Sequence, residues 1–163
     1  MRRLFLVLVG ALALYVGGRA LVHALASHET RIAWVIDDMV DGFNATRMNP
    51  ILDGLDREFL DDTWGADRET VRAAAAHLFF NAVDGETKRF LYRAEWTLTS
   101  ITVSDGPAPS AQVVLEASFF EKRGESEVLA WKVRVDGDMH LQPEGEWCFA
   151  RTRTTTLEGE KPR

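Results

Sequence analysis

The sequence predicts an α+β fold in which an N-terminal hydrophobic helix is followed by three helices and a curved four-strand antiparallel sheet. Two observations predict the folded part. Between residues 29 and 79 the apolar residues recur at the spacing of amphipathic helices. After Asp84-Gly85 the apolar residues alternate with polar ones, which is typical of strands with one buried face. At 163 residues the chain is long enough for one domain with a core and too short for two.

The composition excludes several classes of protein. An apolar share of 46% and a charged share of 27% are ordinary for a folded domain, so we do not expect intrinsic disorder. A formal net charge of -6 repels phosphate backbones, and we therefore expect no nucleic-acid partner. The single cysteine, Cys148, can form no disulfide within the chain and has no second cysteine with which to build a thiolate metal site.

Residues 1–26 have the pattern of a targeting segment. Two arginines precede an uncharged, mostly apolar run from Leu4 to Gly18, and a milder apolar stretch continues past Arg19 to Ala26. A signal peptide has such a basic start, an apolar stretch of ~7–15 residues and a small-x-small cleavage site, here ending at Ala26. A membrane anchor needs ~20 residues, which this stretch provides if Arg19 reaches the membrane interface.

We favour the uncleaved anchor, because the first amphipathic helix begins almost directly after Ala26. An anchor formed by residues 4–26 predicts a single-pass protein of the inner membrane. Cleavage near Ala26 would instead release a periplasmic or secreted domain. In both cases the basic start keeps the N-terminus in the cytoplasm and places the domain outside it.

Three helices are expected in the first half of the domain. The first runs from Glu29 to Asn44, and Asn49-Pro50 begins a short second one. Trp64-Gly65 marks a turn, after which Asp67 caps the third helix. The apolar stripes of the three helices are, in order, Ile32, Val35, Ile36, Met39 and Phe43; Ile51, Leu52, Leu55 and Phe59; and Val71, Ala74, Ala75, Leu78 and Phe79.

Four strands are expected to follow. The first alternates from Phe90 to Leu98, and its parity changes around Thr99, which predicts a bulge or a bend. The other strands cover residues 113–119, 129–141 and 147–157, separated by a loop with Gly124 and by the hairpin Pro143-Glu144-Gly145. The domain is therefore expected over residues 27–157, with a disordered polar tail at 158–163.

The order of these elements resembles the nuclear transport factor 2-like superfamily, which includes ketosteroid isomerase and the SnoaL-like polyketide cyclases. The likeness covers residues 29–157, and the segments that carry it are Phe43-Asn44-Ala45, Ile51 to Phe59, Trp64-Gly65-Ala66-Asp67-Arg68, Tyr92-Arg93-Ala94-Glu95-Trp96 and Pro143-Glu144-Gly145-Glu146-Trp147. The resemblance implies a cone-shaped domain that encloses a pocket and that often forms a homodimer through the open sheet face. Such folds serve as enzymes, carriers and assembly modules, so the resemblance does not choose among these functions.

Aromatic residues that share strand parity are the first candidates for a ligand pocket. Large rings either fill a core or form the walls of a site for a flat or apolar ligand. On the last strand an arginine shares parity with the aromatic residues, and at a pocket mouth it would bind a carboxylate. The pocket candidates are Trp64, Tyr92, Trp96, Trp131, Trp147 and Arg151.

The sequence contains no clear acid–base pair. His77 lies off the apolar stripe of its helix, and Glu95 has the polar parity of its strand beside Arg93, where an ion pair facing solvent is the simplest interpretation. In an enzyme of the superfamily, His77 or Glu95 would act as the base and Tyr92 would stabilise an oxyanion. No two histidines have metal-ligand spacing, so we expect no metal ion and no cofactor.

These features together predict a non-catalytic domain of the cell envelope. It would bind a small apolar ligand or an envelope protein while residues 4–26 hold it at the membrane. The alternative is a SnoaL-like lyase or isomerase that carries out proton transfer in the cone pocket.

Overall fold

The computed structural model describes residues 26–162. The helices are α2 (His28–Asn44), α3 (Met48–Asp53) and α4 (Arg68–Asn81), and the strands are β1 (Leu55–Asp61), β2 (Ala66–Asp67), β3 (Tyr92–Ser104), β4 (Ser110–Arg123), β5 (Ser126–Leu141) and β6 (Trp147–Gly159). The predicted N-terminal hydrophobic helix lies outside the described residues, apart from Ala26. Among residues 26–162 no helix has the length and apolar character needed to cross a membrane.

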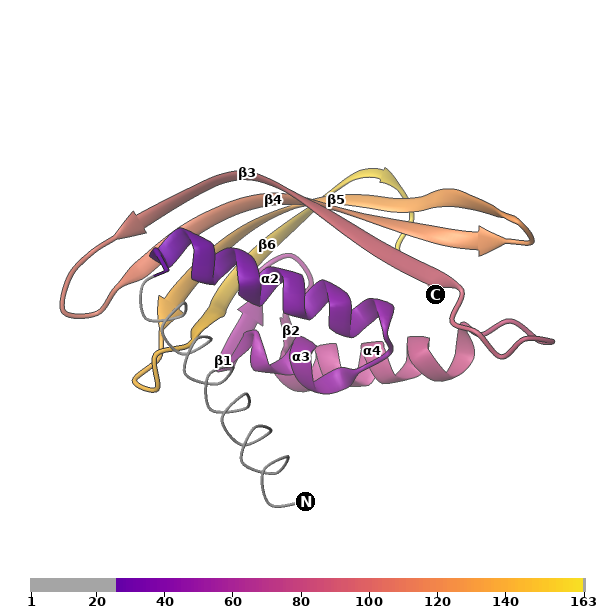
Figure 1. Cartoon of the computed structure of the whole chain (residues 1–163), viewed down its shortest axis with the longest axis horizontal. Coiled ribbons are helices and arrows are strands. Elements are labelled where there is room, and N and C mark those ends of the chain that lie inside the picture. Colours follow the sequence, from indigo (N-terminus) through magenta and orange to yellow (C-terminus); the bar gives the residue numbers. More distant parts are fainter. Residues whose placement is uncertain (1–25, 163) are drawn as a thin grey trace, which may run out of the picture.

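The strands form one sheet in the order β2-β1-β6-β5-β4-β3. In Figure 1 the three helices lie on one side of this sheet, and the strands curve over α2. Neighbouring strands are antiparallel except β1 and β6, which are parallel. The α+β class is confirmed, but the predicted four-strand antiparallel sheet is in fact a mixed sheet of six strands.

The extra strand β1 comes from the segment that was predicted to continue the second helix, and the short β2 comes from the predicted turn before the third helix. α3 ends at Asp53, and Gly54 leads directly into β1. The predicted stripe was ambiguous because Leu55 and Phe59, four residues apart, fit one turn of a helix and also two steps along one face of a strand. The prediction of a helix through Phe59 was therefore wrong.

The starts of α2 and α4 agree closely with the prediction, whereas α3 begins at Met48 with Arg47 before it, so Asn49 lies within the helix and does not cap it. α2 begins one residue before the expected start, where the Ser27 hydroxyl accepts a hydrogen bond from the Thr30 N–H. The Asp67 carboxylate caps α4 by accepting one from the Thr70 N–H at 2.8 Å. These side chains satisfy N–H groups that have no partner within the first turn of a helix.

Two irregularities change which residues of the long strands face the helices. The β3–β4 register shifts between Leu98 and Ser100, which confirms the bulge expected around Thr99. The β5–β6 register also shifts, so that Phe149 pairs with Met139 while Arg151 pairs with Asp138. β6 extends to Gly159, so two residues of the expected tail belong to the strand.

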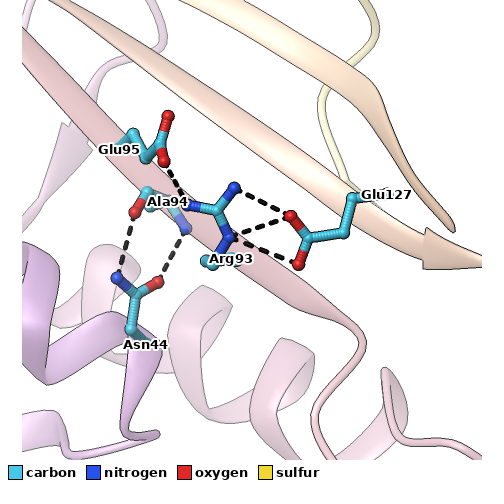
Figure 2. Close-up of polar contacts among 5 residues, drawn as sticks. All are labelled: Asn44, Arg93, Ala94, Glu95 and Glu127. Carbon is cyan, nitrogen blue, oxygen red and sulfur yellow. Dashed lines mark hydrogen bonds and ion pairs between the residues drawn. The ribbon is translucent and has the colours of Figure 1, made fainter. Parts of the chain in front are cut away.

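The core lies between α2, α3 and the inner face of the sheet. Its most buried members include Ile32, Leu52, Val113, Val133, Met139 and Trp147. An amide side chain also fixes α2 to β3: the Asn44 Nδ2 donates to the Ala94 carbonyl oxygen at 3.0 Å, and the Ala94 N–H donates to Asn44 Oδ1 at 2.7 Å (Figure 2). Because β3 is the last strand of the sheet, this amide occupies backbone groups that would otherwise be free.

Candidate functional site

An apolar cavity of about 330 Å³ lies between the inner face of the sheet and the helices. Side chains from α2, α3, β1 and the central strands form its walls, including Ile36, Ile51, Phe59, Leu115, Val133 and Phe149. The volume falls in the range of small-molecule sites, roughly 300–1,000 Å³.

A wider cleft of about 910 Å³ lies beneath α4. It shares Trp64, Phe119 and Trp131 with the smaller cavity, so the two spaces are continuous along these side chains. No residue of α4 is buried, and most of its apolar stripe lines the cleft, whereas Phe79 packs against the rings of Phe43 and Phe90. Small alanine side chains on this face do not reach far enough to fill the space.

Three aromatic rings stand where the two spaces meet. Trp131 stacks on Phe119 with ring centroids 5.2 Å apart, and the Trp64 ring centroid lies 5.7 Å from that of Trp131. The Trp131 Nε1 donates to Thr156 Oγ1 at 3.1 Å, which fixes the orientation of the ring. Lys161 lies 5.6 Å above the Trp64 ring at the solvent side. The site thus has a flat aromatic wall and one cation at its rim.

One acidic side chain, Asp61, lies in the wall of the cavity and is only 4% exposed. Its Oδ2 accepts hydrogen bonds from the hydroxyls of Thr152 (2.8 Å) and Thr154 (3.0 Å). Its Oδ1 accepts from the backbone N–H groups of Thr63 (3.0 Å) and Trp64 (2.9 Å). Four donors occupy the lone pairs of this carboxylate, so none is left to take a proton from a ligand.

Sequence reasoning did not single out Asp61. An aspartate two residues before a threonine and ahead of Trp64-Gly65 is a signal for a turn held by its own side chain. Its two other partners, Thr152 and Thr154, are about ninety positions away, and only the pairing of β1 with β6 brings them close. The signal could therefore have indicated the turn but not the burial.

Three of the predicted pocket residues line the cavity: Trp64, Trp96 and Trp131. The Trp96 Nε1 donates to Asp37 Oδ1 at 2.8 Å, so its polar edge points toward α2. Tyr92 lines neither the cavity nor the cleft; it packs against the Phe90 ring, and burial raises the pKa of its hydroxyl.

Trp147 belongs to the core and not to the cavity wall. It is 1% exposed, and the His28 ring packs edge-on against it at 5.4 Å. Neither Trp147 Nε1 nor His28 Nδ1 has a hydrogen-bond partner among the described residues.

Arg151 lies on the opposite face of the sheet from the cavity. The bulge in β6 after Phe149 reverses the parity, so that Thr152 and Thr154 point inward while Arg151 and Arg153 point outward. The Arg151 guanidinium lies 3.6 Å from Asp62 at the surface. The prediction that Arg151 continues the inward line of Trp147 was wrong, because one extra residue reverses every later side chain.

The two acid–base candidates are not brought together. Glu95 pairs with Arg93, whose guanidinium also binds Glu127 in a two-pronged contact on the outer side of β3 (Figure 2). The hydrogen bonds that Arg93 donates to both carboxylates raise the pKa of Arg93, and the bond to Glu127 lowers the pKa of Glu127. His77 lines the cleft under α4, exposed and in contact with Asn81.

Cys148 is the single cysteine, and it is 1% exposed. Burial raises the pKa of its thiol to about 11. Since the thiolate is the nucleophilic form, Cys148 is not poised for nucleophilic catalysis.

No protein-family model and no curated protein sequence matches the chain. Similar solved structures include a domain of unknown function with a cystatin-like fold from Nostoc punctiforme, at 14% identity and a TM-score of 0.62 over 82% of this chain and 80% of that one. A ketosteroid isomerase-like protein from Erwinia carotovora atroseptica has 9% identity and a TM-score of 0.54 over 79% and 95% of the chains. A nuclear transport factor 2-like protein of unknown function from Shewanella oneidensis has 12% identity and a TM-score of 0.56 over 78% and 98%. At such identities the likeness concerns the fold alone.

Proposed function

On the nuclear transport factor 2-like fold that the chain adopts, we propose a non-catalytic binding domain that holds a small apolar ligand between α4 and the sheet. The proposal rests on the chemistry of the side chains that form the cavity wall. Its surface is apolar and aromatic, and the polar groups of Asp61, Thr152 and Thr154 bind one another. The wall therefore offers a ligand contact area and few free hydrogen-bond partners.

The physical chemistry of such a wall favours apolar ligands. Each 100 Å² of apolar surface removed from water contributes about 2.5 kcal/mol. A polar group carried into the cavity would lose its water without gaining a partner, at a cost of about 1–3 kcal/mol. A charged group on the ligand could stay at the rim, where Lys161 and His77 border the cleft.

A proton-transfer enzyme is the alternative, and no described contact favours it. The carboxylate of Asp61 is saturated by hydrogen bonds, Glu95 is paired with Arg93 outside the cavity, and His77 is at the rim. Steady turnover of a ketone, epoxide or hydroxy-acid that a single cavity substitution abolishes would replace the binding proposal.

The test is native mass spectrometry of the full chain, purified in a mild detergent without denaturation. We expect extra mass that disappears when the protein is denatured. Ligand occupancy is compared between two variants. Ala75→Phe places a ring in the cleft, and Ala73→Phe adds the same ring on the exposed side of α4 as a control.

Ala75→Phe should reduce occupancy at least tenfold, while Ala73→Phe should bind as the wild type does. A fluorescent apolar probe, titrated into each protein after removal of any bound ligand, should likewise bind Ala75→Phe more weakly than Ala73→Phe and the wild type. Equal binding by the two variants, or no binding of either ligand or probe to the wild type, would rule out the cleft as the site.

A further inference from the structure

A second cluster of reactive side chains lies on the face of the sheet opposite the cavity. Asp56 belongs to β1, His140 to β5 and Cys148 to β6. His140 and Cys148 are direct partners in the β5–β6 ladder. Because Cys148 alternates with the core residues Trp147 and Phe149, its side chain points to the other face of the sheet.

One atom from each residue converges on a common point. His140 Nε2 lies 3.2 Å from Asp56 Oδ2 and 3.5 Å from Cys148 Sγ, and Sγ lies 3.8 Å from Oδ2. In a tetrahedral zinc site, bonds of about 2.0–2.3 Å place the ligand atoms roughly 3.3–3.6 Å apart. The three separations agree with these values to within a few tenths of an ångström.

The contacts among Asp56, His140 and Cys148 cannot all be linear hydrogen bonds at once, although Gln142 and the His140 carbonyl oxygen also bond to the cluster. An imidazole nitrogen carries either one hydrogen or one lone pair, directed along a single line in the ring plane. Both Oδ2 and Sγ approach the same nitrogen of His140, so one of them has no linear hydrogen bond to it. A cation among the three atoms would be bound by all of them at once.

Gln142 supplies a fourth group at the same place. Its amide nitrogen lies 3.1 Å from Cys148 Sγ and 3.4 Å from Asp56 Oδ2. The two ends of a glutamine amide differ only in their hydrogen-bonding roles, and a half-turn exchanges them. After that turn the Gln142 carbonyl oxygen would face the same point as a fourth donor.

We propose that Asp56, His140 and Cys148 bind a divalent cation of the zinc class. A set with one nitrogen, one oxygen and one sulfur ligand suits zinc and not magnesium or calcium, which take oxygen ligands. The Glu58 N–H holds the other carboxylate oxygen of Asp56 at 2.7 Å, as a supporting contact that orients a ligand. As the Sγ–metal bond forms, the Cys148 thiol gives up its proton to solvent.

The proposed metal site is accessible from the surface, and an ion bound there would link three strands. The His140 side chain is 40% exposed, so an ion can enter from the surface. Bound there, it would join β1 to β5 and β6 directly. The β1–β6 ladder is irregular between Leu55 and Leu60, so this is a part of the sheet where a cross-link adds stability. The site is independent of the apolar cavity.

Titration of the metal-free full chain with Co²⁺, a spectroscopic substitute for zinc, tests the proposal. We expect one equivalent to produce a thiolate-to-cobalt charge-transfer band and the visible bands of tetrahedral Co²⁺, and Zn²⁺ to displace them. Cys148→Ala should abolish the charge-transfer band, and His140→Gln should weaken binding at least 100-fold. Zn²⁺ should raise the thermal midpoint of the wild type and leave that of His140→Gln unchanged.

His77→Gln is the matched control, because it removes a histidine outside the cluster and should bind Co²⁺ as the wild type does. His140 is partly exposed, so its variant is expected to fold, which circular dichroism of the metal-free proteins checks. The absence of a charge-transfer band in the wild type, or a band of equal strength in folded His140→Gln, would overturn the proposal.

Discussion

Asp61 and Cys148 are both buried, and their neighbours determine what each can do. The Asp61 carboxylate accepts four hydrogen bonds and holds the turn that carries Trp64. Its role is therefore to position a wall residue of the cavity. Burial and, to a lesser extent, the neighbouring Asp56 carboxylate raise the pKa of the Cys148 thiol, which leaves it protonated in the metal-free chain.

Asp61→Ala should destabilise the domain by at least about 2 kcal/mol, because it leaves buried hydroxyl and N–H donors without an acceptor. Asp62→Ala is the matched control, since its partners Arg151 and Arg153 are exposed, and it should cost less than about 1 kcal/mol. Urea denaturation of both variants measures the difference. Equal stabilities would contradict the structural role of Asp61.

At the scale of elements, the helices differ in how firmly they hold to the sheet. α2 buries Ile32 and Ile36 and is bonded through Asn44 to the edge of β3 (Figure 2). α4 has a good cap at Asp67 but buries none of its residues. The helix that covers the cleft is thus the one with the fewest buried contacts, which suits an element that borders a binding site.

Asn44→Ala should lower the free energy of unfolding by about 1–2 kcal/mol, because two hydrogen bonds to the Ala94 backbone are lost. Asn49→Ala removes an exposed amide at the start of α3 and should change stability by less than about 0.5 kcal/mol. Thermal unfolding compares the two. A larger effect at Asn49 than at Asn44 would show that the amide bridge does not hold α2.

At the scale of the whole molecule, the two faces of the sheet have different chemistry. The inner face is apolar, whereas the outer face carries ion pairs such as Lys132–Glu116 and Arg134–Asp136. Exposed pairs of this kind contribute little to stability. The family resemblance predicts a homodimer through the sheet, and the two copies would then have to pair these charges with opposite ones. The mass of the protein in solution tests whether such a dimer forms.

A reporter enzyme that is active only outside the cytoplasm, fused after Arg163, tests the predicted export. We expect activity, because the arginines at positions 2 and 3 keep the N-terminus inside. Arg2→Glu/Arg3→Glu should reduce it. If residues 4–26 are an uncleaved anchor, the full-length protein should be in the membrane fraction. If the chain is cleaved near Ala26, the product should be soluble. A reporter that is inactive in every fusion would contradict export by either route.

The three helices and the four long strands β3 to β6 could be predicted from the sequence because they depend on local signals, whereas β1 and β2 were missed. The caps, the change of apolar period after Asp84-Gly85 and the parity change at Thr99 each act within a few residues. Trp64, Trp96 and Trp131, which the sequence offered as pocket candidates, line one apolar cavity.

Strand pairing determines which residues meet at the candidate sites, and no local sequence pattern reveals how the strands pair. The parallel pairing of β1 with β6 buries Asp61 beside Thr152 and Thr154, and the meeting of β1, β5 and β6 gathers Asp56, His140 and Cys148. A single bulge before Arg151 moved that residue to the other face. Periodicity determines which residues share a face within one strand; only the tertiary structure decides which strands are neighbours and in what register.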